Sequence, residues 1–230
     1  MATIIFDIET GPVAEEQLLA LYREPTWEEF CESCDQRWKP ETRQAKYEEA
    51  KASGWQKFVD RAALSPITGQ VLAVGLLKDG QDPVILGEEE EPEEEQLVAF
   101  WKLFTKYRNE TGRMVGFNNH GFDVPFLIRR SWFHQIPVPD SVFDSKTGYL
   151  SSVFVDLMRV WSCSPRGGEF ISLDRLARFF GIGSKPDDVG GADFARLWTG
   201  SPEERALAIG YLRNDLGMTL NLAKRMGVIL

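Results

Sequence analysis

Five residues in three separate segments of this 230-residue chain have the types and the spacing of a catalytic site. In chain order they are Asp7 and Glu9 in TIIFDIET, Asp123 in GFNNHGFDVPFL, and Tyr211 and Asp215 in YLRND. Carboxylates provide oxygen ligands, which hard divalent cations prefer. Two such cations hydrolyse a phosphodiester, because one lowers the pKa of the attacking water and the other supports the leaving oxygen. The set therefore suggests a two-metal phosphodiesterase site.

The first two acids lie in an apolar, β-branched run that predicts a strand. Residues two apart on a strand point to the same face, so the carboxylates of Asp7 and Glu9 lie about 7 Å apart on one side. Phe6 and Ile8 then point into a core. Two like charges on one face are unfavourable unless a cation lies between them. A lone pair of this kind is more often solvated at a strand edge, so its interpretation depends on the other segments.

Asp123 lies where a short apolar strand gives way to a helical pattern. With Pro125 two residues later, it fits a helix N-cap as well as it fits a metal ligand. The two roles are compatible, because many sites lie at strand-to-helix junctions. Asn118, five residues earlier, would lie at the end of the strand and would reach the same cleft.

A late helix carries the last two residues of the set. Its start is indicated by Ser201, Pro202 and Glu204, an N-cap, a proline in the first turn and a capping-box glutamate. Tyr211 and Asp215 are spaced i, i+4, which places them on one helix face about 6 Å apart. A tyrosine and an aspartate at this spacing are usually a hydrogen-bonded pair on the surface. A catalytic role for them is favoured only because the other carboxylates are present.

Together the three segments resemble a known family. FDIET, N-x-x-x-F-D (Asn118 to Asp123) and Y-x-x-x-D (Tyr211 to Asp215) are similar to the three motifs of the DEDD-superfamily 3′–5′ exonucleases. The tyrosine in the third motif is typical of the DEDDy branch, in contrast to the branch with histidine there. The chain most resembles free-standing relatives of the proofreading domain of family B DNA polymerases. The resemblance covers most of the chain except about residues 12–62.

The resemblance implies a ribonuclease H-like α/β fold, a mixed five-stranded sheet flanked by helices, in a single exonuclease domain over residues 1–230. The length suits one domain with a sizeable core. An α/β alternation is also visible in the residues, because helical patterns follow Glu94, Asp123 and Ser172. The strand-like runs are Thr3–Ile8, Val71–Leu77, Val84–Gly87, Met114–Phe117 and Val153–Asp156.

The implied activity is removal of nucleotides from the 3′ end of nucleic acid. Single-stranded DNA is the favoured substrate, RNA trimming is an alternative, and the cofactors are two Mg²⁺ or Mn²⁺ ions because every ligand is an oxygen. We expect Asp7 to bridge both ions, with Glu9 and Asp215 completing one site. Asp123 would hold the second ion directly or through water. Tyr211 would orient the attacking water, since a phenol with a pKa of about 10 is a poor base.

Further residues are candidates for substrate contact by the same resemblance. Thr10, Asn118 and Phe122 would contact the 3′-terminal nucleotide, although core packing is an equal alternative for Phe122. His120 is expected to touch the cleft without binding metal. Asp156 is left outside the metal site. Arg166 and Lys185 lie in Gly/Ser/Pro-rich loops, where solvated charges are favoured over phosphate contacts.

The segment at about residues 12–62 is expected to form a helical insertion of two or three amphipathic helices. It would serve as a wall or lid of the cleft or as a structural appendage. Cys31 and Cys34 form a lone C-x-x-C, which makes a poor zinc site. We expect reduced thiols in a cytoplasmic protein. The sequence shows no secretory or membrane segment and assigns no protein partner.

The net charge of −9 lies almost wholly in the first half of the chain. Residues 1–115 carry 13 Lys and Arg against 23 Asp and Glu, whereas residues 116–230 carry 13 against 12. Seven glutamates lie in the run Glu88–Glu95, which we expect to be a solvated loop leading into a helix. This balance argues against tight nonspecific binding of duplexes but permits a cleft that grips a few nucleotides.

A nucleic-acid binding module that has lost catalysis is the alternative from a different class. The four carboxylates and the tyrosine count against it, because an inactive copy has no reason to keep a cluster of like charges. The sequence alone does not decide whether the substrate is DNA or RNA, since no residue in it is identifiable as a contact to a 2′-hydroxyl group.

Overall fold

The computed structural model describes residues 2–144, 149–164, 170–185 and 190–229. The chain divides into two compact units, and each is described by itself. The sheet unit comprises Met1–Thr10 and Val71–Leu230, and the helical unit comprises Gly11–Gln70. Within the described ranges, none of the helices combines the length and the apolar character that crossing a bilayer requires.

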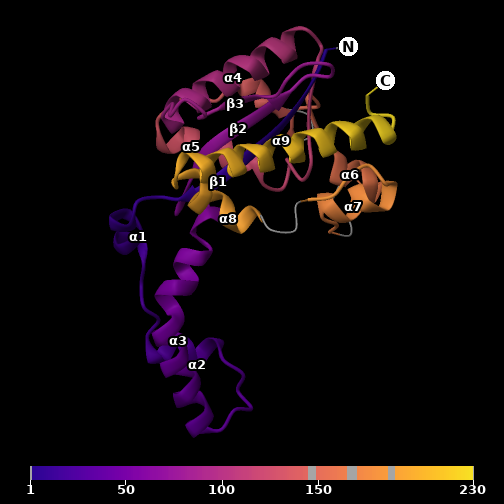
Figure 1. The fold of residues 1–230 in the computed structure, drawn as a ribbon. Helices are drawn as coiled ribbons and strands as arrows, with labels where there is room; N and C mark the ends of the chain where they lie inside the picture. Colours follow the sequence, from indigo (N-terminus) through magenta and orange to yellow (C-terminus); the bar gives the residue numbers. More distant parts are fainter. Residues whose placement is uncertain (1, 145–148, 165–169, 186–189, 230) are drawn as a thin grey trace. The chain divides into compact units, whose positions relative to one another are not determined.

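A mixed five-stranded sheet of order β3-β2-β1-β4-β7 forms the centre of the sheet unit (Figure 1). Its strands in chain order are β1 (Thr3–Pro12), β2 (Gly69–Leu77), β3 (Val84–Leu86), β4 (Arg113–Gly116) and β7 (Phe154–Asp156). β1, β4 and β7 run parallel, whereas β3 is antiparallel to β2. A separate two-stranded ribbon pairs β5 (Phe143–Asp144) with β6 (Tyr149–Leu150).

Helices cover both faces of this sheet. The core on one face includes residues of α4 (Glu93–Asn109) and α5 (Asp123–Phe133). The core on the other includes residues of α7 (Leu173–Phe180), α8 (Gly191–Trp198) and α9 (Pro202–Arg225). The short helix α6 (Leu157–Ser162) follows β7 directly, and a 3₁₀ turn spans Asp140–Val142. The predicted fold class, an α/β sheet with flanking helices, is confirmed.

Alternation along β1 decides which layer each of its side chains joins. Phe6 and Ile8 are buried in the core beneath α4 and α5, as their positions on the strand predict. Ile5 is buried in the core beneath α9. Residues two apart share a face, so Asp7 and Glu9 point to the same side as Ile5. The strand thereby carries both carboxylates toward the layer that contains α9.

The start of α9 is formed by the capping residues that the sequence predicts. The hydroxyl oxygen of Ser201 accepts the Glu204 N–H at 3.3 Å, and the Glu204 carboxylate accepts the Ser201 N–H at 2.9 Å. Pro202 is the first helical residue, where its missing N–H costs no hydrogen bond. The cap fixes the register of the helix that carries Tyr211 and Asp215.

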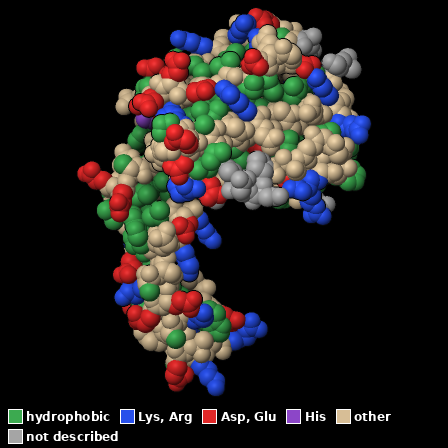
Figure 2. Space-filling model, viewed as in Figure 1, with side chains coloured by type: hydrophobic (Ala, Val, Ile, Leu, Met, Phe, Trp, Pro, Cys, Tyr) green, Lys and Arg blue, Asp and Glu red, His purple; other side chains and the backbone are tan. Residues whose placement is uncertain are grey.

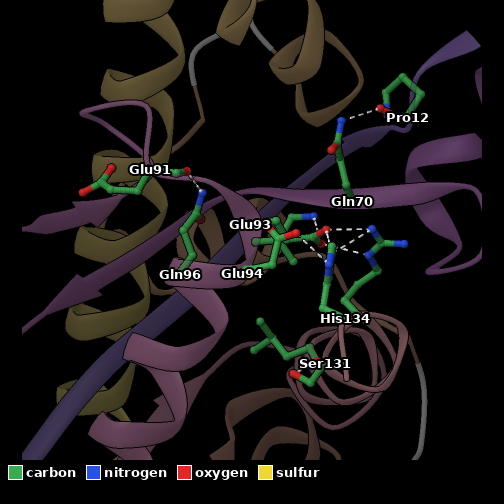
Figure 3. Close-up of polar contacts among 11 residues, drawn as sticks. Pro12, Gln70, Glu91, Glu93, Glu94, Gln96, Ser131 and His134 are labelled. Carbon is green, nitrogen blue, oxygen red and sulfur yellow. Dashed lines mark hydrogen bonds and ion pairs between the residues drawn. The ribbon is translucent and has the colours of Figure 1, made fainter. Parts of the chain in front are cut away.

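A buried ion-pair network joins α4, α5 and β2 (Figure 3). The Glu93 carboxylate accepts hydrogen bonds from the Val71 N–H at 2.7 Å and from Arg130 Nε and Nη2 at 2.9 and 2.6 Å. His134 Nε2 lies 2.7 Å from the same carboxylate. Burial alone would raise the pKa of Glu93, but the hydrogen bonds from Arg130 and Val71 lower it below its ordinary value. The expectation of a fully solvated run at Glu88–Glu95 is therefore wrong for Glu93, whose partner Arg130 lies 37 residues away.

The helical unit contains α1 (Glu15–Leu21), α2 (Trp27–Ser33), α3 (Pro40–Asp60) and a 3₁₀ turn at Ala62–Leu64. These helices lie in the segment where the sequence predicts them. Aromatic side chains pack against one another in two groups within this unit. One group is Tyr22, Trp55 and Phe58, and the other is Trp27, Phe30 and Tyr47. Both cysteines of α2 and its C-cap, Cys31 and Cys34, are free thiols.

Candidate active site

Three carboxylates converge between β1 and α9. Asp7 and Glu9 lie just beyond the stretch from Thr3 to Ile5 in which β1 pairs with β4. One carboxylate oxygen from each of Asp7, Glu9 and Asp215 lies within 4.8 Å of the other two. The cluster is thus at the carboxyl end of parallel strands, where ligands bind in open α/β sheets.

Asp123 is fastened to the same strand. It is 3% exposed, and its Oδ1 accepts the backbone N–H of Ile8, the residue between the two acids of β1, at 3.1 Å. Phe122 occupies the N-cap position of α5, so Asp123 is the first residue of the helix. The alternative that Asp123 is the N-cap is therefore wrong. The hydrogen bond holds the beginning of α5 against β1, next to Asp7 and Glu9.

The four carboxyl groups depart strongly from ordinary titration. Burial, reinforced by the charges of Asp123, Glu9 and Asp215, raises the pKa of Asp7 well above its usual value. Burial and the charge of Asp215 raise the pKa of Glu9 to about 8. Burial also raises the pKa of Asp123 to about 7 and that of Asp215 above its ordinary range. Such shifts arise when acids are crowded together away from water without sufficient positive charge.

One cation of the chain itself reaches this cluster. Lys185 forms an ion pair with Asp215, and its Nζ donates to the Tyr211 hydroxyl oxygen at 2.5 Å. Its backbone N–H donates to Asp174 of α7 at 2.7 Å, which fixes the loop. Burial would lower the pKa of Lys185, but the Asp215 carboxylate raises it above its usual value. The expectation of a solvated loop charge is wrong for Lys185, because its ammonium group bonds to Tyr211 and Asp215. These partners lie 26 and 30 residues away in the sequence, so the local pattern does not reveal them.

Tyr211 keeps its proton throughout the ordinary pH range. Burial and the negative charge of Asp215 raise the pKa of its phenol to about 12. The Lys185 ammonium donates to the hydroxyl oxygen, and a hydrogen bond from the Tyr211 hydroxyl to Asp215 is one of the interactions that lower the pKa of that carboxyl group. Tyr211 is suited to orient a neighbouring group and is a poor base.

The donor set fits divalent cations. The buried Oδ1 of Asp215 has no hydrogen-bond partner among the residues that the structure describes. A buried carboxylate oxygen without a donor is rare in folded proteins and marks a place for an ion or water. Among the described residues, these four carboxylates have one ion pair, between Lys185 and Asp215. Oxygen-only ligation suits Mg²⁺ or Mn²⁺ better than zinc. Asp7, Glu9, Asp123 and Asp215 could hold such ions.

Asp156 shapes the loop that leads to Asp123. It is 3% exposed at the end of β7, and its Oδ1 accepts the N–H groups of Asn118 and Met158, both at 2.9 Å. Its Oδ2 accepts the His120 N–H at 3.2 Å. Asn118 has a φ of +58°, a left-handed conformation that asparagine tolerates better than most residues. Asp156 therefore supports the second motif without belonging to the carboxylate cluster.

Replacing Asp156 with alanine is expected to destabilise the fold and to disturb the cluster. The substitution leaves buried N–H groups without an acceptor, which costs about 1–3 kcal/mol. Urea denaturation measures the loss of stability, and titration with Mn²⁺ measures the affinity of the cluster. Asp82→Asn, which alters an exposed acid, is the control. Unchanged stability would show that these hydrogen bonds do not hold the loop.

The other predicted residues occupy varied positions. Thr10 follows Glu9 and is 8% exposed. The Phe122 ring is partly buried and lies 5.4 Å from that of Phe126, which favours the core-packing alternative. His120 turns its Nε2 to the Phe154 carbonyl at 3.2 Å. Arg166 lies outside the described residues. Contact of Thr10, Asn118 and Phe122 with substrate stays a prediction.

Comparison with known proteins places this arrangement in a family. A family model described as the RNase_H superfamily matches residues 61–226. The fold is similar to the family B DNA polymerase of the hyperthermophilic archaeon Pyrobaculum calidifontis, with a TM-score of 0.61 and 18% identity. The match covers 97% of this chain and 24% of the polymerase chain, so the likeness concerns the fold and a part of that protein. No curated protein matches the sequence.

Proposed function

Because the chain belongs to the RNase H superfamily, we propose that it is a metal-dependent 3′–5′ exonuclease acting on single-stranded DNA. The observation that carries this proposal is the convergence of Asp7, Glu9 and Asp215, whose carboxylate oxygens lie within 4.8 Å of one another. Two contacts support the inclusion of Asp123 and Tyr211. Asp123 accepts the N–H of Ile8, the residue between Asp7 and Glu9, and Tyr211 shares the Lys185 ammonium with Asp215. The motif resemblance supplies the direction of cleavage.

Each residue has a role in the proposed reaction. Asp7, Glu9, Asp123 and Asp215 would hold two Mg²⁺ or Mn²⁺ ions. These ions, when bound, lower the pKa of the attacking water and stabilise the leaving oxygen. The Tyr211 hydroxyl keeps its proton and orients the water by hydrogen bonding. Lys185 offsets part of the negative charge at Asp215. The helices at about residues 12–62 would be an insertion in a single nuclease domain.

The test uses 5′-labelled single-stranded DNA and RNA of the same sequence, each with Mg²⁺, Mn²⁺ or EDTA. We expect a ladder of products that shortens from the 3′ end, requires metal and disappears in Asp7→Asn. The exposed-acid variant Asp82→Asn is the control and should retain the ladder. In parallel, Mn²⁺ should raise the melting temperature of the wild type but not that of Asp7→Asn, because a ligand that binds only the folded state stabilises it.

The possible results separate the proposal from its alternatives. A ladder on RNA alone would replace DNA by RNA as the substrate and leave the mechanism in place. Binding of oligonucleotides without cleavage in any metal would favour the silent binding module. Cleavage that survives EDTA or the Asp7→Asn substitution would overturn the metal-dependent mechanism.

A further inference from the structure

A cluster of three aromatic rings with one exposed member lies on α6 and α7. Phe179 is 70% exposed, and its ring centroid lies 5.7 Å from that of Trp161 and 5.0 Å from that of Phe180. Phe180 is partly buried against the core under α9, so it anchors the cluster while Phe179 projects from it. An exposed ring of this kind can stack with an unpaired nucleobase.

Arginine side chains lie near this cluster although the net charge of the whole chain is negative. The described stretch 170–185 contains Arg175, Arg178 and Lys185 and one acidic residue, Asp174, whereas Glu169, Asp187 and Asp188 lie outside the described residues. The Arg225 guanidinium of α9 lies 5.9 Å from the Phe180 ring centroid. Lys and Arg side chains gather at the edge formed by α6 and α7 (Figure 2). The combination of aromatic rings and positive charge is the one that binds single-stranded nucleic acid.

Side-chain orientation brings charge and ring onto one surface. Arg175 and Phe179 are spaced i, i+4 on α7, so they are neighbours on its surface. Both are exposed, and Arg175 forms no ion pair with any residue that the structure describes. The acid of the described stretch, Asp174, is occupied by Arg178 Nε at 2.8 Å and by the Lys185 N–H. The positive charge of Arg175 therefore faces solvent beside an exposed ring.

A short path of contacts connects this surface to the carboxylate cluster. Lys185, which touches Tyr211 and Asp215 through its side chain, donates its backbone N–H to Asp174 of α7. The loop from α7 to Lys185 is four residues long, since α7 ends at Phe180. α6 and α7 lie side by side below α9 (Figure 1), and their rings are in contact.

We propose that the aromatic–basic surface of Trp161, Phe179 and Arg175 binds the single-stranded segment of nucleic acid upstream of the 3′ end. The inference rests on the proposed function for the location of that end. Stacking on Phe179 requires bases that are free of a complementary strand, because a duplex hides its base faces. Arg175 would neutralise a backbone phosphate. A single strand is thus the occupant that uses both the rings and the charge.

The test compares substrates of different length. They are the p-nitrophenyl ester of thymidine 5′-monophosphate and single-stranded DNA of about 3 and about 12 nucleotides. Dissociation constants of the oligomers are measured by fluorescence anisotropy in an Asp7→Asn background with Mg²⁺. Cleavage rates are measured in the otherwise unaltered protein. The proposal requires the ester to use the carboxylate cluster alone and the longer oligomer to reach α7 as well.

We expect Phe179→Ala to weaken binding of the longer oligomer about tenfold, since a base stacked on an aromatic ring is worth at least a severalfold change in affinity. The loss should be at least about fivefold smaller for the trimer and for ester hydrolysis. Arg175→Gln should reduce the salt dependence of binding. Trp132→Ala is the matched control, because Trp132 is 60% exposed on α5, at the opposite sheet face.

The outcomes distinguish failure of this inference from failure of the proposed function. Cleavage with equal effects of Phe179→Ala and Trp132→Ala on the long oligomer would overturn the surface and leave the nuclease intact. Equal losses for the ester and the long oligomer would also overturn it. Loss of binding in Phe179→Ala without any hydrolysis of ester or DNA would support the surface and reject the nuclease. Failure of the parent protein to bind the long oligomer would overturn the surface.

Discussion

We expect Asp215→Asn to lower the rate of the proposed metal-dependent cleavage by more than about 100-fold, because even residues that only support metal ligands contribute 10- to 100-fold. Asp215 is one of the three acids whose oxygens converge within 4.8 Å, and its buried Oδ1 has no partner among the described residues. The amide removes a negative charge and a ligand oxygen from the cluster. Single-turnover cleavage of labelled DNA at saturating Mg²⁺ measures the loss.

Tyr211→Phe provides the graded comparison on the same helix. The phenylalanine retains the ring in its buried position and removes only the hydroxyl, whose pKa of about 12 makes it an orienting group. We expect its loss of activity to be smaller than that of Asp215→Asn. The exposed-acid variant Asp82→Asn should cleave at the wild-type rate. If Tyr211→Phe were as inactive as Asp215→Asn, the result would contradict a purely orienting role. The hydroxyl would then have to act in proton transfer.

Glu93→Gln destabilises the protein by about 3–5 kcal/mol, the cost of leaving one partner of a buried ion pair uncompensated. Arg130 is 3% exposed, and the Glu93 carboxylate is its partner at 2.6 Å. The same carboxylate accepts the Val71 N–H, so the substitution also loosens the link between β2 and α4. Urea denaturation at neutral pH measures the difference in unfolding free energy.

The pH dependence of this difference has a defined sign. Arg130 lowers the pKa of Glu93 in the folded state below the ordinary value of 4.5. The carboxylate therefore contributes its full stability above pH 4.5, and this contribution is lost as the pH falls through the lower folded-state pKa. Glu94→Gln is the matched control. Glu94 contacts the same His134 but is 52% exposed, and its loss should cost less than about 1 kcal/mol.

The sequence predicts those features that depend on neighbours along the chain. Alternation along Thr3–Ile8 identifies β1, and the cap at Ser201 identifies the start of α9, because strand faces and helix caps are set by residues within a few positions. The RNase H-like fold is confirmed by the sheet order and by the family match over residues 61–226. The assignment of Asp7, Glu9, Asp123, Tyr211 and Asp215 to catalysis stays a prediction.

The features that the sequence misses are set by partners that are distant in the chain. Lys185 looks like a loop charge until the fold brings Asp215 to it, and Glu93 looks solvated until Arg130 covers it. The residues around Asp156 do not indicate that its carboxylate accepts the N–H groups of Asn118 and His120, which lie 38 and 36 residues away. In each case the burial of a charged group depends on tertiary contacts, which local pattern does not encode.

The carboxylate cluster also depends on contacts between segments that are far apart along the chain. Asp7 comes from the first strand and Asp215 from the last helix, so their meeting closes a loop of roughly two hundred residues, a slow and entropically costly step in folding. During synthesis the N-terminal part of a chain emerges first. A growing chain therefore contains Asp7, Glu9 and Asp123 before Asp215 has been synthesised. The proposed site is complete only after α9 has docked on the sheet.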